Sequence, residues 1–194
     1  MIKAIIFDCF GVLTTDGWLK FCDTYLKDEA KAAEGHRLNH LVDEGRIGYP
    51  EFLNLISELS GVDKAEVDRT IAEPIPKNTE LLDYIKSLKP RFKMAILSNI
   101  SNPDWFKEYF AADELAIFDE IIVSSREGII KPDPRIFHIA LDKLGVRPEE
   151  AVFIDDRQKN VDAAQQLGIK SFLYQNYAQC RDELEKLVTP VADN

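Results

Sequence analysis

Apolar and polar positions along this chain follow two patterns that divide it into segments. Residues 2–8 are almost continuously apolar, which is typical of a strand that is covered on both faces. The next comparable run comes only at residues 92–98. Between them, residues 16–71 carry apolar side chains at helical spacing, interrupted by glycine and proline turns. The chain therefore predicts a first strand followed by a long helical insert.

From residue 78 onward, short apolar runs alternate with helical patterns. The predicted strands are 92–98, 120–124, 151–155 and 170–173, and the predicted helices are 103–110, 134–144, 161–167 and 182–188. Asn78 is expected to cap a further helix, because asparagine is a favoured N-cap residue. Strands and helices that alternate in this way form parallel sheets with right-handed crossovers. We expect an α/β, doubly wound parallel sheet, with a core of residues 1–15 and 75–194 and an all-helical insert of residues 16–74.

Composition and charge narrow the function classes. The 194 residues include 34 acidic and 24 basic side chains, for a net charge of −10, without a run of five basic residues. Nucleic-acid and anionic-membrane binding both need clustered Lys and Arg, so we expect neither. The three cysteines are far apart in sequence, which argues against a zinc site or disulfides and fits a cytoplasmic protein. No apolar stretch approaches a membrane span, no signal peptide is expected, and both a monomer and a homodimer remain open.

Polar side chains gather near the ends of the predicted strands. The candidates are Asp8, Ser98, Asn99, Asp155 and Asp156, which follow apolar strand-like runs, and Lys131, which follows a polar turn. The carboxyl ends of parallel strands open on one edge, which is where open α/β sheets place their chemistry. Each candidate alone has an ordinary explanation, such as a helix cap or a solvated lysine, but their joint occurrence in this order indicates one pocket.

These residue types suit phosphoryl transfer. An aspartate such as Asp8 can attack phosphorus and form an aspartyl-phosphate, while Lys131 and the Ser98 hydroxyl would bind the negatively charged phosphoryl group. Mg²⁺ prefers oxygen ligands. Its expected ligands are Asp8, the backbone carbonyl of Phe10, Asp155 and Asp156.

This arrangement resembles the haloacid dehalogenase-like (HAD) hydrolase superfamily. The motifs that carry the resemblance are residues 7–14, 97–99, 130–133 and 153–161. The resemblance implies a Rossmann-like core of strand order 5-4-1-2-3 and a C1 helical cap that closes over substrate. Residues 44–47 and 160–164 also resemble the sugar-1-phosphate phosphatase and epoxide-hydrolase N-terminal branch. The implied substrate is a small phosphorylated metabolite, for which a sugar phosphate is one candidate.

One position departs from this family. Its phosphatases usually carry a second Asp two residues after the nucleophile, and here that residue is Phe10, which transfers no proton. Three hypotheses follow. The chain is a Mg²⁺-dependent phosphatase whose acid comes from elsewhere, for example from Asp16 or His36, or whose substrate has a good leaving group. Alternatively it is a 2-haloacid dehalogenase, whose family members carry an aromatic residue there, or a weakly active or inactive binding protein.

Substrate choice is expected to depend on the helical insert. The candidates for contacting a sugar or a carboxylate are Trp18, His36, Arg37, His40 and Arg46. For each of them, packing between helices or solvation is the alternative explanation. The sequence does not name the substrate.

Overall fold

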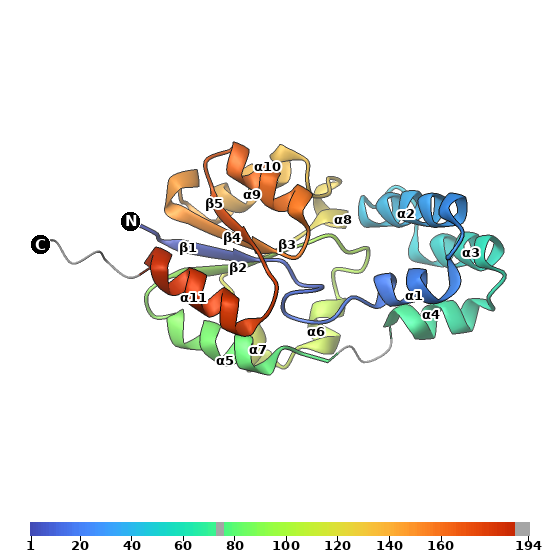
Figure 1. Ribbon diagram of the computed structural model, residues 1–194, viewed down its shortest axis with the longest axis horizontal. Coiled ribbons are helices and arrows are strands. Elements are labelled where there is room, and N and C mark those ends of the chain that lie inside the picture. Colours follow the sequence, from blue (N-terminus) through green and yellow to red (C-terminus); the bar gives the residue numbers. More distant parts are fainter. Residues whose placement is uncertain (73–75, 189–194) are drawn as a thin grey trace, which may run out of the picture.

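A five-stranded parallel sheet forms the centre of the molecule (Figure 1). The computed structural model describes residues 1–72 and 76–188. The strands are β1 (Ala4–Phe7), β2 (Lys93–Ser98), β3 (Glu120–Val123), β4 (Ala151–Asp155) and β5 (Lys170–Leu173). Their order is β3-β2-β1-β4-β5, and every pair is parallel. Counted from the other edge this is 5-4-1-2-3, so the predicted fold class and strand order are confirmed.

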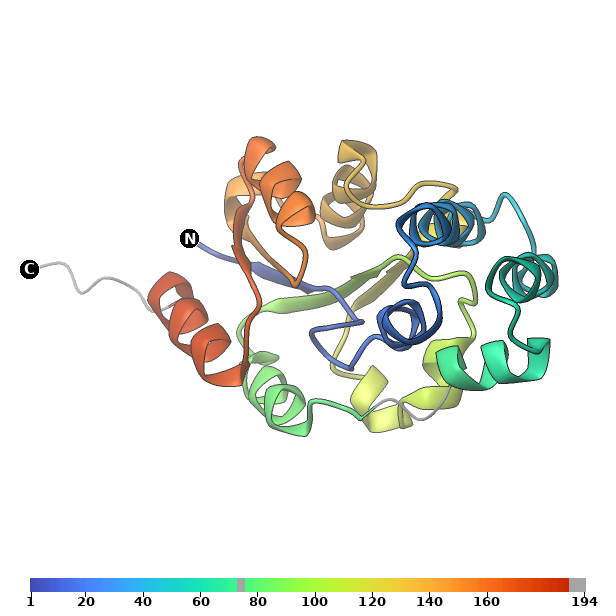
Figure 2. The ribbon, with the colours of Figure 1, turned by 45° about the vertical axis from the view of Figure 1, so that its right-hand side comes forward.

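Helices cover both faces of the sheet, as the alternating pattern predicted. On one face lie α9 (Pro134–Leu144) and α10 (Gln158–Gln166), and on the other lie α5 (Thr79–Leu88) and α11 (Tyr177–Val188) (Figures 1 and 2). The short elements of the core are α6 (Trp105–Tyr109), α7 (Ala112–Leu115), α8 (Ser124–Glu127) and the 3-10 turn η1 (Pro148–Glu150). Within the described ranges, no helix has the length and apolar character needed to cross a membrane.

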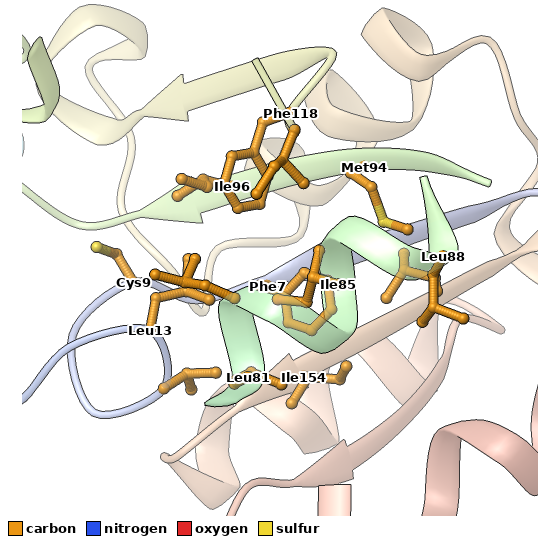
Figure 3. Close-up of a cluster of buried hydrophobic side chains, with 14 of the residues drawn as sticks. Phe7, Cys9, Leu13, Leu81, Ile85, Leu88, Met94, Ile96, Phe118 and Ile154 are labelled. Atoms are coloured by element: carbon orange, nitrogen blue, oxygen red, sulfur yellow. The ribbon is translucent and has the colours of Figure 1, made fainter. Parts of the chain in front are cut away.

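A hydrophobic core flanks each face of the sheet, and the larger one lies between the sheet and helices α5 and α11. Figure 3 shows side chains of β1, such as Phe7, packed against Leu81 and Ile85 of α5, with Ile96 and Ile154 from the neighbouring strands. Alternate residues of the same strands face the opposite way. Because a residue period of two sends neighbours to opposite faces, a strand covered on both sides must be apolar throughout, as β1 is.

Four helices follow β1 and lie together beyond the carboxyl ends of the strands (Figure 1). They are α1 (Gly17–Tyr25), α2 (Glu29–Asp43), α3 (Tyr49–Ser60) and α4 (Lys64–Ala72). Their apolar faces form a separate core around Trp18, Phe21, Phe52 and Ile56, which agrees with the predicted all-helical insert. The predicted boundary between residues 74 and 75 lies outside the described residues, and the division into two domains stays a prediction.

The chain enters and leaves this insert at nearly the same point. The backbone N–H of Asn78 donates to the carbonyl of Leu13 at 2.8 Å, and Thr14 pairs with Lys77 in an isolated antiparallel bridge. The Asn78 side chain accepts a hydrogen bond from Leu81 N–H as the predicted cap of α5, and it donates to the Val12 carbonyl at 3.1 Å. The two connections are therefore fastened to each other.

Some elements differ from their predicted limits at the helix starts. Helix α10 begins at Gln158 rather than at residue 161. The prediction missed its first turn because the side chains there are polar and show no apolar periodicity. Helix α11 begins at Tyr177 rather than at residue 182, after Asn176 accepts a hydrogen bond from Gln179 N–H. Helix α6 is shorter than predicted and spans Trp105–Tyr109.

Candidate active site

The sheet register brings the predicted site residues to one edge. Phe7 pairs with Ile96 on one side and with Ile154 on the other, so β1, β2 and β4 end level with one another. Asp8 directly follows β1, and its N–H donates to the carbonyl of Ile154 at 2.8 Å. Ser98 and Asp155 are the last residues of β2 and β4. The expected convergence at the carboxyl edge is what the structure shows.

Lys131 lies at the centre of this edge. Its Nζ is 2.7 Å from Asp8 Oδ1 and 2.7 Å from Asp155 Oδ2. Only 2% of Lys131 is exposed, although lysine is almost never buried unless it is paired. Burial lowers the pKa of Lys131, but the charges of Asp155 and Asp8 outweigh it and hold that pKa above its usual value. The ammonium is therefore a fixed positive charge beside Asp8.

The Lys131 loop is fixed by an asparagine at the end of β2. Asn99 Nδ2 donates to the Lys131 carbonyl at 3.1 Å, and Lys131 N–H donates back to Asn99 Oδ1 at 2.9 Å. Asn99 is therefore not a helix cap. Its neighbour Ser98 is fully buried, and the hydroxyl oxygen of Ser98 has no hydrogen-bond partner. A buried hydroxyl without a partner is uncommon and points to a missing ligand.

The two adjacent carboxylates Asp155 and Asp156 differ in their surroundings. Asp155 accepts hydrogen bonds from Asn160 Nδ2 and from the backbone N–H of Arg157 at 2.9 Å, besides its pairing with Lys131. Asp156 has a buried Oδ1 without a partner. Burial raises the pKa of Asp156 to about 6, and the Asp155 charge adds to the increase. Asp155 thus binds the side chains and backbone around it, whereas Asp156 Oδ1 is available to bind a ligand.

The carboxylates of Asp8, Asp155 and Asp156 offer three oxygens that all lie within 4.8 Å of one another. Burial raises the pKa of Asp8 to about 7 even though Lys131 lowers it, and the charges of Asp155 and Asp156 contribute to the rise. Like charges this close favour the binding of a cation or of protons. The donor set is all oxygen, which suits a hard divalent cation.

Gly11 leaves room for Asp156 in the turn after β1. A Cβ at Gly11 would lie 2.2 Å from Asp156 Oδ2, and the backbone there has φ +89°, a conformation that favours glycine. The preceding Phe10 turns its ring toward Trp105, with ring centroids 4.9 Å apart. The side chain two residues after Asp8 is therefore part of an aromatic wall and carries no proton.

A cavity of about 310 Å³ opens above these residues, between the sheet edge and the helical insert. Asp8, Asn99 and Lys131 line its floor. Its aromatic walls come from Phe10 and Trp105 of the core and from Trp18, Tyr49 and Phe52 of the insert. A volume of this order is within the range of small-molecule sites.

A family model described as haloacid dehalogenase-like hydrolase matches residues 2–168. The chain belongs to this family. The match spans β1 to the end of α10 and includes all six candidate site residues. The resemblance seen in the motifs is therefore confirmed, and the chain is a member of a family of hydrolytic enzymes.

Individual relatives of this HAD-like hydrolase match it over nearly its full length. It is 30% identical to a sesquiterpene phosphatase from Aspergillus oryzae over 195 residues, which cover 96% of each chain. It is 26% identical to a D-ribitol-5-phosphate phosphatase from Bacteroides thetaiotaomicron, covering 95% of this chain and 97% of that one. A solved structure of a predicted HAD-like family hydrolase from Porphyromonas gingivalis superposes with a TM-score of 0.77 at 26% identity, covering 98% of this chain and 100% of that one.

Other curated relatives are much longer than this HAD-like hydrolase. The chain spans only 29%, 15% and 21% of the length of three of them. Those proteins therefore contain long segments that this chain does not match, and their activities are not transferred to it.

The insert residues predicted to contact substrate divide into two groups. Trp18 and His40 line the cavity of the HAD-like hydrolase, and their contact with substrate stays a prediction. His36 does not line it and instead accepts a hydrogen bond from Trp18 Nε1 at 3.3 Å. Arg37 and Arg46 are also absent from the lining, because they form ion pairs on the surface with Glu34 and Glu44.

Polar residues that line this cavity and that the sequence analysis did not single out include Arg157, Asn160 and Asp43. Arg157 and Asn160 lie inside the fourth motif, next to its two aspartates. Arg157 Nη2 donates to Asp16 Oδ2 at 3.0 Å, which joins the core to the N-cap of α1. Asp43, at the end of α2, had no sequence signal, because its burial depends on how the insert packs against the core.

Proposed function

We propose that this chain is a Mg²⁺-dependent phosphatase that acts on a small phosphorylated metabolite through an aspartyl-phosphate intermediate. The observation that carries the proposal is a buried Asp8 carboxylate 2.7 Å from the Lys131 ammonium, in the lining of the cavity between the sheet edge and the insert. The relatives named as phosphatases over their full length support it.

The donor set at the sheet edge fits Mg²⁺. Asp8 and Asp156 would hold the ion with the Phe10 carbonyl, and Asp155, the first residue of the pair, would support them through its contact with Lys131. The buried, unpartnered Asp156 Oδ1 and the three oxygens within 4.8 Å support this assignment. When bound, Mg²⁺ would offset the repulsion between the Asp8 carboxylate and the phosphoryl oxygens.

The side chains of the site have separate tasks in this reaction. An Asp8 carboxylate oxygen attacks phosphorus, so that an O–P bond to Asp8 forms and the bond to the leaving oxygen breaks. Lys131 and the free Ser98 hydroxyl bind the phosphoryl oxygens, and Asn99 holds the Lys131 loop in place. Water then attacks the phosphorus of the aspartyl-phosphate, which releases phosphate and restores Asp8.

The walls of the cavity define the kind of substrate that we propose. Residues 16–74 would act as a cap, with Trp18 and Phe52 facing the core residues Phe10 and Trp105 across the bound molecule. Aromatic faces accept both hydrocarbon groups and the C–H face of a sugar, so a screen should contain isoprenoid phosphates and sugar phosphates. We further propose that the enzyme works in the cytoplasm as a monomer or homodimer, consistent with three buried cysteines that form no disulfide.

Hydrolysis of p-nitrophenyl phosphate, with Mg²⁺ and with EDTA, tests the proposal. Its good leaving group needs little help from an acid, so Phe10 should not mask activity. We expect turnover that depends on Mg²⁺ and falls at least about 10³-fold in Asp8→Asn, because the nucleophile is lost. Asp142→Asn makes the same chemical change at an exposed position of α9 and should retain full activity. Equal activity of Asp8→Asn and the unchanged protein would exclude Asp8 as the nucleophile.

A 2-haloacid dehalogenase is the second candidate, because Phe10 places an aromatic side chain where that group of enzymes carries one. In that case Asp8 would attack carbon, and chloride release from a 2-chloroacid would proceed in EDTA. The three clustered carboxylates argue for the phosphatase, since a site that attacks a haloacid gains nothing from Asp156. Failure of both assays would favour a binding protein without hydrolytic activity.

A further inference from the structure

With Phe10 in place of the usual acid, the phosphatase that we propose needs a proton donor from another element. The side chains able to give a proton among the described residues that line the cavity, apart from the site groups already named, are Asp16, His40, Asp43, Tyr49, Asp68 and Glu108. Both oxygens of Asp16 are engaged, one by Leu19 N–H and the other by Arg157. Asp16 is therefore held by the helix start and by Arg157 and has no unengaged oxygen to present to a leaving group.

Four of the other candidates are also unsuited. Burial lowers the pKa of His40, which disfavours the imidazolium that an acid would need. The Tyr49 hydroxyl donates its hydrogen bond to Asp68 Oδ1 at 2.9 Å, so these two side chains bind each other, and burial raises the pKa of Tyr49 above its usual value. Glu108 is exposed on α6, where nothing withdraws it from water. Asp43 is the candidate that remains.

Asp43 is anchored to the core although it belongs to the insert. Its carbonyl accepts a hydrogen bond from the buried Ser124 hydroxyl at 2.6 Å. The same hydroxyl oxygen accepts from Ile100 N–H at 3.0 Å, in the loop that follows Asn99. That loop lines the cavity, so a chain of two buried hydrogen bonds fixes the end of α2 beside the catalytic edge.

The Asp43 side chain is buried among charged groups in the cavity lining. Asn39 Nδ2 donates to Asp43 Oδ2 at 2.8 Å from one helical turn earlier. The charged groups that face it from other elements are Arg157 after β4, Asp16 at the start of α1 and Asp8 after β1. Burial raises the pKa of Asp43 to about 8, with Arg157 opposing the increase and Asp16 adding to it. The carboxyl therefore carries a proton at neutral pH, as a general acid must.

We propose that Asp43 is the general acid–base residue of this enzyme and takes over the task of the aspartate that Phe10 replaces. The inference rests on the proposed phosphatase function. As the bond between phosphorus and the leaving oxygen breaks, the Asp43 carboxyl gives its proton to that oxygen, and an alcohol departs. The Asp43 carboxylate then takes a proton from the water that attacks the aspartyl-phosphate. Phosphate leaves, Asp8 is free, and Asp43 is protonated again.

The test compares two leaving groups in Asp43→Asn, an isosteric change that keeps the side-chain size. Ethyl phosphate has a poor leaving group, so single-turnover formation of ethanol should slow roughly 10²–10⁴-fold. p-Nitrophenyl phosphate needs no acid in the first step. Its p-nitrophenol burst should stay within about threefold of the unchanged protein, and steady-state turnover should fall because the second step lacks its base. A retained burst also proves that the site is folded.

Glu44→Gln is the matched control, since it makes the same change at the adjacent residue, which does not line the cavity. It should leave both rates unchanged. An Asp43→Asn variant that slows both first steps equally, or neither, overturns the role of Asp43 and leaves the phosphatase standing. Absence of turnover by the unchanged protein overturns the phosphatase, and the role of Asp43 with it.

Discussion

Lys131 holds together charges that would otherwise repel one another. Its ammonium contacts Asp8 and Asp155, and all three side chains are almost entirely excluded from water. A buried charge is tolerated only when it is paired, and removing one partner leaves the other charge uncompensated. The contact that orients Asp8, the nucleophile that we propose, therefore also contributes to the stability of the fold.

Replacing Lys131 by methionine should destabilise the protein by about 3–5 kcal/mol, because two buried carboxylates lose their cation. Urea unfolding at neutral pH measures this change. Lys143→Met is the control, since Lys143 pairs with Glu127 at 2.7 Å on the surface and should cost less than about 1 kcal/mol. Adding Asp155→Asn to Lys131→Met should restore part of the lost stability. Similar losses for both single variants would contradict this account of the buried pair.

The candidate residues differ in how far their sequence context revealed them. Asp8, Ser98 and Asp155 lie at strand ends, and parallel pairing brings strand ends together. Asp43 is an acidic residue near the end of a helix, which is ordinarily solvated. Its burial results from packing of α2 on α8 and from a hydrogen bond to Ser124, 81 positions away in sequence. Contacts between distant segments of this kind leave no local pattern.

The tight turn after β1 determines how the backbone beside Asp8 approaches Asp156 at the sheet edge. The N–H groups of Val12, Leu13 and Thr14 all point at the Cys9 carbonyl, and Gly11 N–H donates to Thr14 O at 2.6 Å. This tight turn requires the positive φ of Gly11 and brings its Cα against Asp156. Backbone shape and carboxylate position are thus set together.

Gly11→Ala should lower both stability and activity. The positive φ alone costs roughly 1–2 kcal/mol, and the new Cβ would displace Asp156 from the carboxylate cluster. Gly61→Ala has a similar φ of +74° with nothing within 4 Å of the added atom, so it should lose comparable stability and keep its activity. Urea unfolding and Mg²⁺ titration of p-nitrophenyl phosphate turnover separate the two effects. An unchanged Mg²⁺ requirement in Gly11→Ala would argue against Asp156 as a ligand.

Strands were predicted more accurately than helix starts. The buried, largely apolar run of residues 151–155 defines β4 to the residue, and β5 also has its predicted limits although it begins with exposed Lys170. Helix α10 begins with a polar turn, whose side chains carry no period, and α11 begins five residues before the predicted start. Short helices such as α8 depend on the loops that they join and could not be predicted from periodicity.

At the scale of the whole molecule, buried polar contacts join the insert to the core. Arg157 Nη2 donates a hydrogen bond to Asp16 Oδ2 at the start of α1, and the Ser124 hydroxyl donates to the Asp43 carbonyl at the end of α2. Because Asp43 is enclosed at this junction, its protonation is linked to global folding. Its carboxyl has a pKa of about 8 when folded and about 4 when unfolded.

Stability should therefore fall as pH rises through this range. Between about pH 4 and pH 8 the folded state keeps the Asp43 proton and the unfolded state releases it, so this group lowers the free energy of unfolding by about 1.4 kcal/mol per pH unit. Urea unfolding at pH 5, 6 and 7 should show a flatter slope in Asp43→Asn, since the amide at position 43 does not titrate, whereas the other groups titrate equally in both proteins. Parallel slopes for Asp43→Asn and the unchanged protein would show that the carboxyl is already ionised in the folded state.

The fastening of Asn78 to Leu13 has a consequence for how such proteins diversify. Everything between these two residues is, for the sheet, one loop with joined ends. The entropy of closing a loop grows slowly, by about 0.6 kcal/mol for each doubling of its length. A lineage can therefore enlarge, shorten or exchange this segment and so acquire a new substrate, while the strand order and the nucleophile of the ancestral enzyme are inherited unchanged.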